Sequence, residues 1–135
     1  MDCRRCESHG TFRQSDVLFG TVNGGTLILS GGDYFFQSLT INANVTGRVQ
    51  PTTRIFDRNT LGFQSPLLAA SGTTVQRVTL GFAGTNLSML ATFNGTLIAP
   101  SASVSFGTDT SLTFTGSFFA RTLEATPGTN LVCSP

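Results

Sequence analysis

The sequence predicts an all-β protein built as a single-domain β-helix, a solenoid with coils of about 21 residues. Three observations support this fold class. An eight-residue phrase that begins with glycine occurs at residues 32–39, 95–102 and 116–123. The last two copies start 21 residues apart, and the first two start 63 apart, which is three times 21. Strand-forming segments fill the chain, and none has the apolar spacing of a helix.

The composition favours a folded domain and excludes several classes of partner. The chain has 135 residues, enough for one domain with a continuous core. Only 11% of the residues are charged, lysine is absent, and the eight arginines nearly balance seven acids. We therefore expect no nucleic-acid partner, because no broad positive field can form. No run of about 18 apolar residues occurs, so we expect no membrane span.

Strand signals follow one another after a polar N-terminal arm, residues 1–16, and the β-helix domain is expected over residues 17–135. The signals are short, rich in β-branched and aromatic residues, and separated by turn-forming residues. The expected strands are residues 26–29, 34–36, 39–41, 54–56, 75–82, 96–98, 104–106, 111–114 and 118–119. A long loop is expected near residues 59–72, where Gly62, Pro66 and Gly72 interrupt the pattern.

The repeat interval predicts which residues share a position in successive coils. Gly95 aligns with Gly116, and the interval projected back places coil starts near Thr53 and Thr74. The segment at Thr53 fits the phrase, whereas the segment at Thr74 does not, so we expect a loop to lengthen that coil. The expected interior positions include Leu27, Leu29, Tyr34 or Phe35, Ile55, Leu97, Phe106 and Phe118.

Two phrases resemble a region found in large secreted bacterial surface proteins. Residues 93–100 read Phe-Asn-Gly-Thr-Leu-Ile-Ala-Pro, and residues 114–120 read Phe-Thr-Gly-Ser-Phe-Phe-Ala. The phrase that starts at Gly32 is similar to the beginning of the same region. The resemblance covers roughly residues 31–133 and implies a β-helical C-terminal region of uncharacterised role, with no catalytic residues. The stacked coils are also distantly similar in architecture to bacterial ice-binding proteins and to the bactofilin filament proteins.

The three cysteines and the single histidine lie near the chain ends. Cys3, Cys6 and His9 are spaced as Cys-x2-Cys-x2-His, and Cys133 lies at the other end of the sequence. Together they could form a tetrahedral zinc site, but half a zinc motif is weak support. Disulfide bonds among Cys3, Cys6 and Cys133, within one chain or between neighbours, are the favoured interpretation, with free thiols as the other. We expect no bound metal or cofactor.

The acidic residues do not form the pattern of a catalytic site. Asp33, Asp57, Asp109 and Glu124 fall in different coils, and the histidine has no Ser and Asp partners at a recognisable spacing. We therefore expect no enzyme activity. The arginines of the middle region, Arg48, Arg54, Arg58 and Arg77, are expected to be solvated charges. Outward ladders of threonine, which an ice-binding face requires, are poorly developed at the 21-residue interval.

The C-terminal end of the solenoid is expected to be uncapped. Residues 129–133 are strand-like, and no covering helix or loop is expected after them. Unpaired strand edges at the ends of a solenoid recruit further strands. We therefore expect a structural protein that stacks on copies of itself, head to tail, into a filament. The expected interface residues are Phe12, Leu131 and Val132, and cysteines are expected to lock the joint.

The alternative function is a monomeric surface module that binds a glycan or ice through one face of the rod. Residues 1–12 lack the apolar core of a secretory signal, which leaves open a processed precursor or a protein that stays inside the cell. Given the resemblance, we expect an extracellular or cell-surface location.

Overall fold

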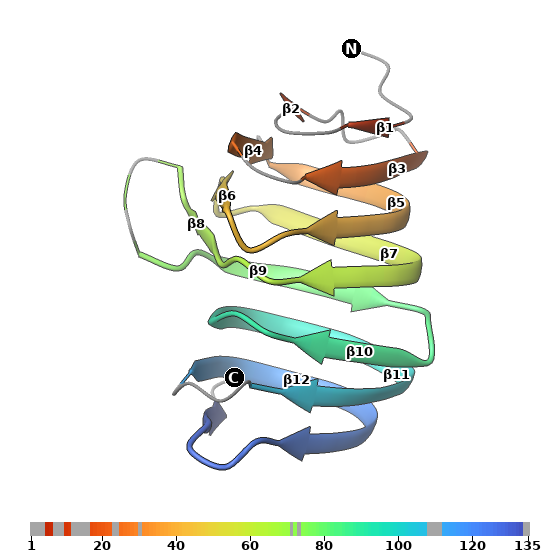
Figure 1. The fold of residues 1–135 in the computed structure, drawn as a ribbon, viewed down its shortest axis with the longest axis vertical. Helices are drawn as coiled ribbons and strands as arrows, with labels where there is room; N and C mark the ends of the chain where they lie inside the picture. Colours follow the sequence, from red (N-terminus) through yellow and green to blue (C-terminus); the bar gives the residue numbers. More distant parts are fainter. Residues whose placement is uncertain are drawn as a thin grey trace.

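The computed structural model describes residues 5–6, 10–11, 17–22, 25–29, 31–70, 72, 74–107 and 112–133. These residues form a β-solenoid of about five turns, each about 20 residues long, and contain no helix. The coils stack along the long axis of the molecule, from the N-terminal end to the C-terminal end (Figure 1). The predicted all-β solenoid is therefore confirmed. Within the described part of the chain, no helix is long and apolar enough to cross a membrane.

The described residues contain thirteen strands. They are β1 (Arg5–Cys6), β2 (Gly10–Thr11), β3 (Val17–Val22), β4 (Gly25–Leu29), β5 (Gly32–Ile41), β6 (Val45–Val49), β7 (Thr53–Phe63), β8 (Leu67–Ala69), β9 (Arg77–Phe82), β10 (Asn86–Met89), β11 (Phe93–Phe106), β12 (Thr113–Ala125) and β13 (Asn130–Cys133). All ladders between these strands are parallel, because each coil pairs with the same part of the next one.

The strands of the described residues lie on three faces of the rod, and only the coils nearer the N-terminus contribute to the third. We call the first face residues 32–36, 53–57, 78–82, 95–99 and 116–120. We call the second face residues 38–41, 60–63, 86–89, 103–106 and 122–125. The third face is the separate sheet of β2, β4, β6 and β8. Strands β5, β7, β11 and β12 run through both the first and the second face. They turn the corner between these faces where the register shifts, between Phe36 and Ser38 and between Ala99 and Ser103.

The register confirms the predicted coil interval where the coils are regular. Gly32 pairs with Thr53, and Gly95 pairs with Gly116. The coil that was expected to start near Thr74 resumes at Arg77, which pairs with Asn94. Between β8 and β9 the chain leaves the coil, as expected for a lengthened coil.

The predicted loop near residues 59–72 is only partly a loop. Residues 59–63 complete β7, with Leu61 and Phe63 buried and Thr60 exposed. This alternation places apolar side chains inside and polar ones outside, which a strand on a solenoid face requires. The protruding segment begins later, after β8, where Leu68 bridges Val75 in the antiparallel direction and the amide of Ala69 donates to the carbonyl of Thr74. Figure 1 shows this hairpin projecting from the side of the rod between β8 and β9.

Two short pieces of the predicted N-terminal arm, residues 1–16, belong to the stack. Strand β1 pairs with β3, and β2 pairs with β4, both within the same chain. These four residues therefore add a partial turn to the solenoid.

The core runs along the centre of the rod, and the predicted interior positions line it. Leu27, Leu29, Ile55, Leu97 and Phe106 are fully buried. Of the two adjacent candidates in β5, Tyr34 points inward and Phe35 points outward. Phe118 is partly buried and packs against Phe106 with ring centroids 5.2 Å apart. Edge-to-face contacts of this kind fill the core between β7, β11 and β12, because large rings leave little void between stacked turns.

Candidate functional site

The C-terminal end of the rod presents an open strand edge. Strand β12 pairs with β11 through both faces, but β13 pairs with β12 only at residues 113–116. Residues 117–125 therefore have a strand on one side only among the described residues. Leu123, Leu131 and Val132 are 47%, 38% and 48% exposed at this end. Of the predicted interface residues, Leu131 and Val132 are thus accessible, and Phe12 lies outside the described residues.

The cysteines give a partial answer to the predicted disulfide or zinc chemistry. Cys133 lies in β13, pairs in register with Gly116, and carries an exposed free thiol. Cys3 and His9 lie outside the described residues, and only the backbone of Cys6 is described, in β1. No three His, Cys, Asp or Glu side chains come together within the described residues. Pairing with Cys3 or Cys6 stays a prediction.

The acids of the described chain do not meet one another. Asp33 forms a bidentate ion pair with Arg54 on the first face, with its Oδ1 2.6 Å from Nε and its Oδ2 2.8 Å from a terminal nitrogen. Glu124 is exposed on the second face. Asp109 lies outside the described residues. Asp57 is buried and occupies a different position, described next.

Asp57 is an inward-facing carboxyl at the corner between the first and second faces. It pairs in register with Phe36 on one side and Phe82 on the other, so the carboxyl lies between two aromatic positions. Its Oδ2 accepts a hydrogen bond of 2.8 Å from the amide of Leu39, and its Oδ1 accepts one of 3.1 Å from the amide of Asn59. Burial raises the pKa of Asp57 to about 7, because desolvation of the charged form outweighs these backbone hydrogen bonds. The carboxyl therefore ties two coils together at the corner.

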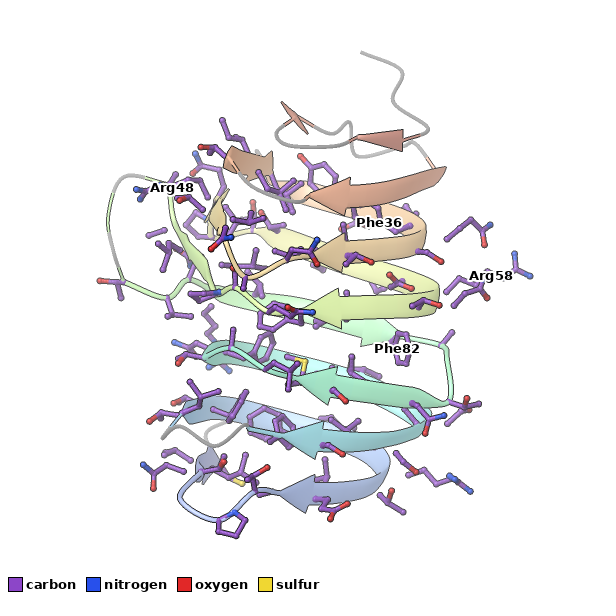
Figure 2. All side chains as sticks on the ribbon, viewed as in Figure 1. Phe36, Arg48, Arg58 and Phe82 are labelled. Carbon is purple, nitrogen blue, oxygen red and sulfur yellow. The ribbon has the colours of Figure 1, made fainter. Side chains whose placement is uncertain are left out.

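The sequence predicts that the arginines of the middle region are solvated charges. The structure shows that this is not true of all of them. Arg48 is half-buried and donates to the carbonyls of Ala69 and Gly72, which holds the protruding hairpin against the third face. Arg54 pairs with Asp33. Arg58 is exposed at the corner (Figure 2), which agrees with the expectation for that residue.

The first face carries an outward column of apolar residues. In register, Phe35 pairs with Phe56, Phe56 with Gly81, Gly81 with Ile98, and Ile98 with Phe119. Phe35, Ile98 and Phe119 are 44%, 42% and 59% exposed. The rings of Phe35 and Phe56 stack with centroids 5.2 Å apart. Because Gly81 has no side chain, the column is interrupted there by a groove of about 440 Å³.

The second face carries two outward columns of small polar residues. One column contains Ser38, Thr60, Asn86, Ser103 and Thr122, and the other contains Thr40, Gly62, Ser88, Ser105 and Glu124. These columns are mixed, so they are not the threonine ladder at the 21-residue interval that was considered from the sequence. Asn86 pairs with Ser103, and Ser103 with Thr122, at intervals shorter than 21 residues, so a fixed interval does not align them. Only Glu124 among these residues is charged.

Comparison of the chain with known protein families, with characterised proteins and with solved structures finds no match. The resemblance to the β-helical region of bacterial surface proteins therefore stays a prediction. The candidate sites rest on this chain alone: the open edge, the apolar groove and the two polar columns.

Proposed function

We propose that this protein is a structural, non-enzymatic β-solenoid module that assembles head to tail into filaments at the cell surface or outside the cell. The observation that carries this proposal is the open edge of β12 at residues 117–125, beside the exposed side chains of Leu123, Leu131 and Val132. An unpaired strand edge with apolar neighbours is a template for another strand. A further coil on this end would bury all of these groups.

The direction of the strands supports addition of a second copy in the same orientation. Because every ladder between named strands is parallel, the next copy can continue the sheet without reversing the chain direction. The strand that opens the long sheet, β1, would then lie against the end formed by β12 and β13. Such a contact joins the N-terminal end of one copy to the C-terminal end of the next. Each outer end of the assembly still presents one of these two surfaces, so further copies can add without closing a ring.

Cys133 supports a covalent lock at this joint. Its thiol is exposed in β13, at the end where the next copy would add. In this proposal it forms an intermolecular disulfide with Cys3 or Cys6 of the neighbouring copy under oxidising conditions.

The proposal is tested by negative-stain microscopy and sedimentation velocity over a range of concentrations, with and without reductant. We expect rods that lengthen with concentration and shorten when the thiols are reduced. The double variant Leu131→Glu with Val132→Glu is expected to remain monomeric. The control is Ile28→Glu, which places one glutamate at a residue 44% exposed on the third face and is expected to assemble normally. A wild-type protein that stays monomeric at high concentration under oxidising conditions contradicts the proposal.

A second candidate function is supported by the polar columns of the second face. Their hydroxyl and amide groups repeat in register over five parallel strands, about 4.8 Å apart, on a surface whose one charge is Glu124. Such a face favours the function of a monomeric surface module that binds ice or an ordered, hydroxyl-rich glycan.

Retention on growing ice and on insoluble polysaccharides tests this second candidate. Ser105→Tyr raises a large side chain from the middle of the second face and is expected to abolish retention. Thr46→Tyr makes the same change at an exposed residue of the third face and is expected to retain binding. Equal retention of the two variants argues against binding through the second face.

A further inference from the structure

The groove in the first face is a built pocket at the corner of the rod. Its floor is Gly81, and Phe56 and Ile98 form its walls in the coils on either side. The remaining lining is Phe35, Phe36, Gln37, Asp57, Arg58, Phe82, Ala83 and Pro100. Figure 2 shows Phe36 and Phe82 at the same side of the rod, with Arg58 projecting from the corner beside them. At about 440 Å³ the groove has the size of a small-molecule site.

The groove depends on glycine at position 81. Every other described residue of that outward column has a large apolar side chain, so a side chain at 81 would fill the gap. A Cβ at Gly81 would also lie 2.7 Å from the ring of Phe56, which leans over it. Gly81 therefore leaves room for the ring of Phe56, and the groove lies beside this ring, with aromatic and aliphatic walls.

The polar groups of the groove lie at its corner end and are positive or neutral. The exposed guanidinium of Arg58 makes no hydrogen bond or ion pair with any described residue. Gln37 accepts a hydrogen bond of 3.3 Å from the side-chain amide of Asn59. Asp57 is 2% exposed, and both of its oxygens accept backbone hydrogen bonds. Burial raises the pKa of Asp57 to about 7, so at pH 6 this carboxyl is mostly neutral.

We propose that this groove binds an elongated apolar molecule that carries a carboxylate, in the manner of a medium-chain fatty acid. The chain lies over Gly81 between Phe56 and Ile98, where apolar surface is buried on both sides. The carboxylate lies at the corner, where the exposed guanidinium of Arg58 supplies a positive charge. This binding site does not depend on head-to-tail assembly. The assembly uses the open edge of β12 and β13 at the C-terminal end of the rod.

The size of the first face favours a small ligand over a second copy of the chain. Five strands about 4.8 Å apart, each five residues long, give a face of about 24 Å by 17 Å, or about 400 Å². A stable interface between two proteins buries about 800 Å² on each partner. The first face alone is therefore too small for a stable lateral dimer, whereas the groove is large enough to enclose a ten-carbon chain.

Displacement of a fluorescent probe tests the proposal at pH 6. The probe is 1-anilinonaphthalene-8-sulfonate, which is apolar and anionic. Decanoate and decanol are the competitors, because they share a chain length and differ in charge. We expect saturable binding at one site per chain and displacement by decanoate at lower concentration than by decanol.

Three variants separate this site from other apolar surfaces. Ala83→Trp fills the groove from an exposed corner residue and is expected to abolish displacement by both competitors. Arg58→Glu is expected to weaken decanoate binding on the order of fivefold and to leave decanol unchanged. The matched control is Arg121→Glu, at an exposed arginine just after Ala120 in β12, which is expected to change neither. Circular dichroism checks that each variant keeps its strands.

The outcomes decide between a ligand and other occupants. Decanoate binding that survives Ala83→Trp in a folded protein overturns the proposal, as does the lack of any saturable site. A wild-type dimer that Ala83→Trp dissociates would assign the groove to a second copy and would also overturn it. The proposed filament is assayed separately by sedimentation of the Leu131 and Val132 variants, so neither result decides the other.

Discussion

Gly116 packs directly on Gly95 in the preceding coil, with φ angles of 140° and 138° at the two residues. A Cβ on Gly116 would lie 1.7 Å from the carbonyl oxygen of Gly95. A Cβ on Gly95 would in turn lie 1.8 Å from the carbonyl oxygen of Val78. The backbones of these coils are therefore so close at this position that only glycine fits. This close approach explains why the copies at Gly95 and Gly116 begin with glycine.

Gly116→Ala is expected to lower the free energy of unfolding by about 3 kcal/mol, because the new Cβ meets backbone and the φ angle is unfavourable for alanine. Chemical denaturation followed by circular dichroism measures the change. The control is Gly72→Ala in the hairpin, where the nearest atom to an added Cβ is 4.0 Å away and the expected effect is within about 0.5 kcal/mol. Equal midpoints for Gly116→Ala and the wild type would contradict the close backbone approach.

Asp57 is expected to make stability depend on pH between about 4 and 7. Its pKa is about 7 in the folded protein and 3.8 without the fold, so the folded state holds the proton more tightly. The stability from this group is fully present below pH 3.8 and is lost as the pH rises through 7. The slope reaches at most about 1.4 kcal/mol for each pH unit.

Asp57→Asn is expected to remove this slope, because the amide does not titrate in this range. Asp33→Asn serves as the control and is expected to keep it. Denaturation midpoints at pH 4, 5, 6, 7 and 8 measure both variants. A wild-type protein whose stability rises from pH 4 to 7 would show that the backbone hydrogen bonds to Asp57 dominate instead.

Thr53→Val is expected to stabilise the protein by about 1 kcal/mol. The side chain of Thr53 is buried, and its Oγ1 has no hydrogen-bond partner among the residues that the structure describes. Residue 53 shares its position with the apolar Val78 of another coil, because Arg54 pairs with Thr79 one residue further on. Thr46→Val, at an exposed residue of the third face, is expected to change the free energy of unfolding by less than about 0.5 kcal/mol. A loss of stability in Thr53→Val would mean that the hydroxyl has a bound partner.

The Asp33 and Arg54 pair is expected to contribute only about 0.2 to 1 kcal/mol, because both side chains are substantially exposed and water screens the charges. A double-mutant cycle of Asp33→Asn and Arg54→Gln measures the coupling free energy. The coupling is expected to fall in 1 M salt, since exposed ion pairs are screened at about that ionic strength. A coupling above about 2 kcal/mol would show that the pair is less solvated than its exposure indicates.

The coil and its core were accessible from the sequence, and the surface columns were not. Gly95 and Gly116 mark the same position because both coils have the same length between these two points. A search of the sequence at a fixed interval does not find the outward columns, because coils gain or lose residues at corners. The register shift between Ala99 and Ser103 is an example. Residues beyond such a corner no longer align at 21.

Two residues show what local reasoning could have added. Thr60 lies in a stretch that was expected to be a loop, yet the alternation of Thr60, Leu61, Gly62 and Phe63 is that of a strand. Asp57 follows Ile55 at strand spacing, which places its carboxyl on the buried side of β7. Nothing in the sequence indicates that Phe56 and Ile98 flank Gly81, because that contact depends on two separate coil lengths.

The parallel ladders also determine how the rod responds to force. Hydrogen bonds between coils run along the rod, so tension between its ends acts on the coil boundaries in series, and the weakest boundary yields first. Each coil that detaches releases about 20 residues, or roughly 70 Å of extended chain. We expect a molecule that yields in even steps and lengthens many-fold before it breaks, as an elastic tether does.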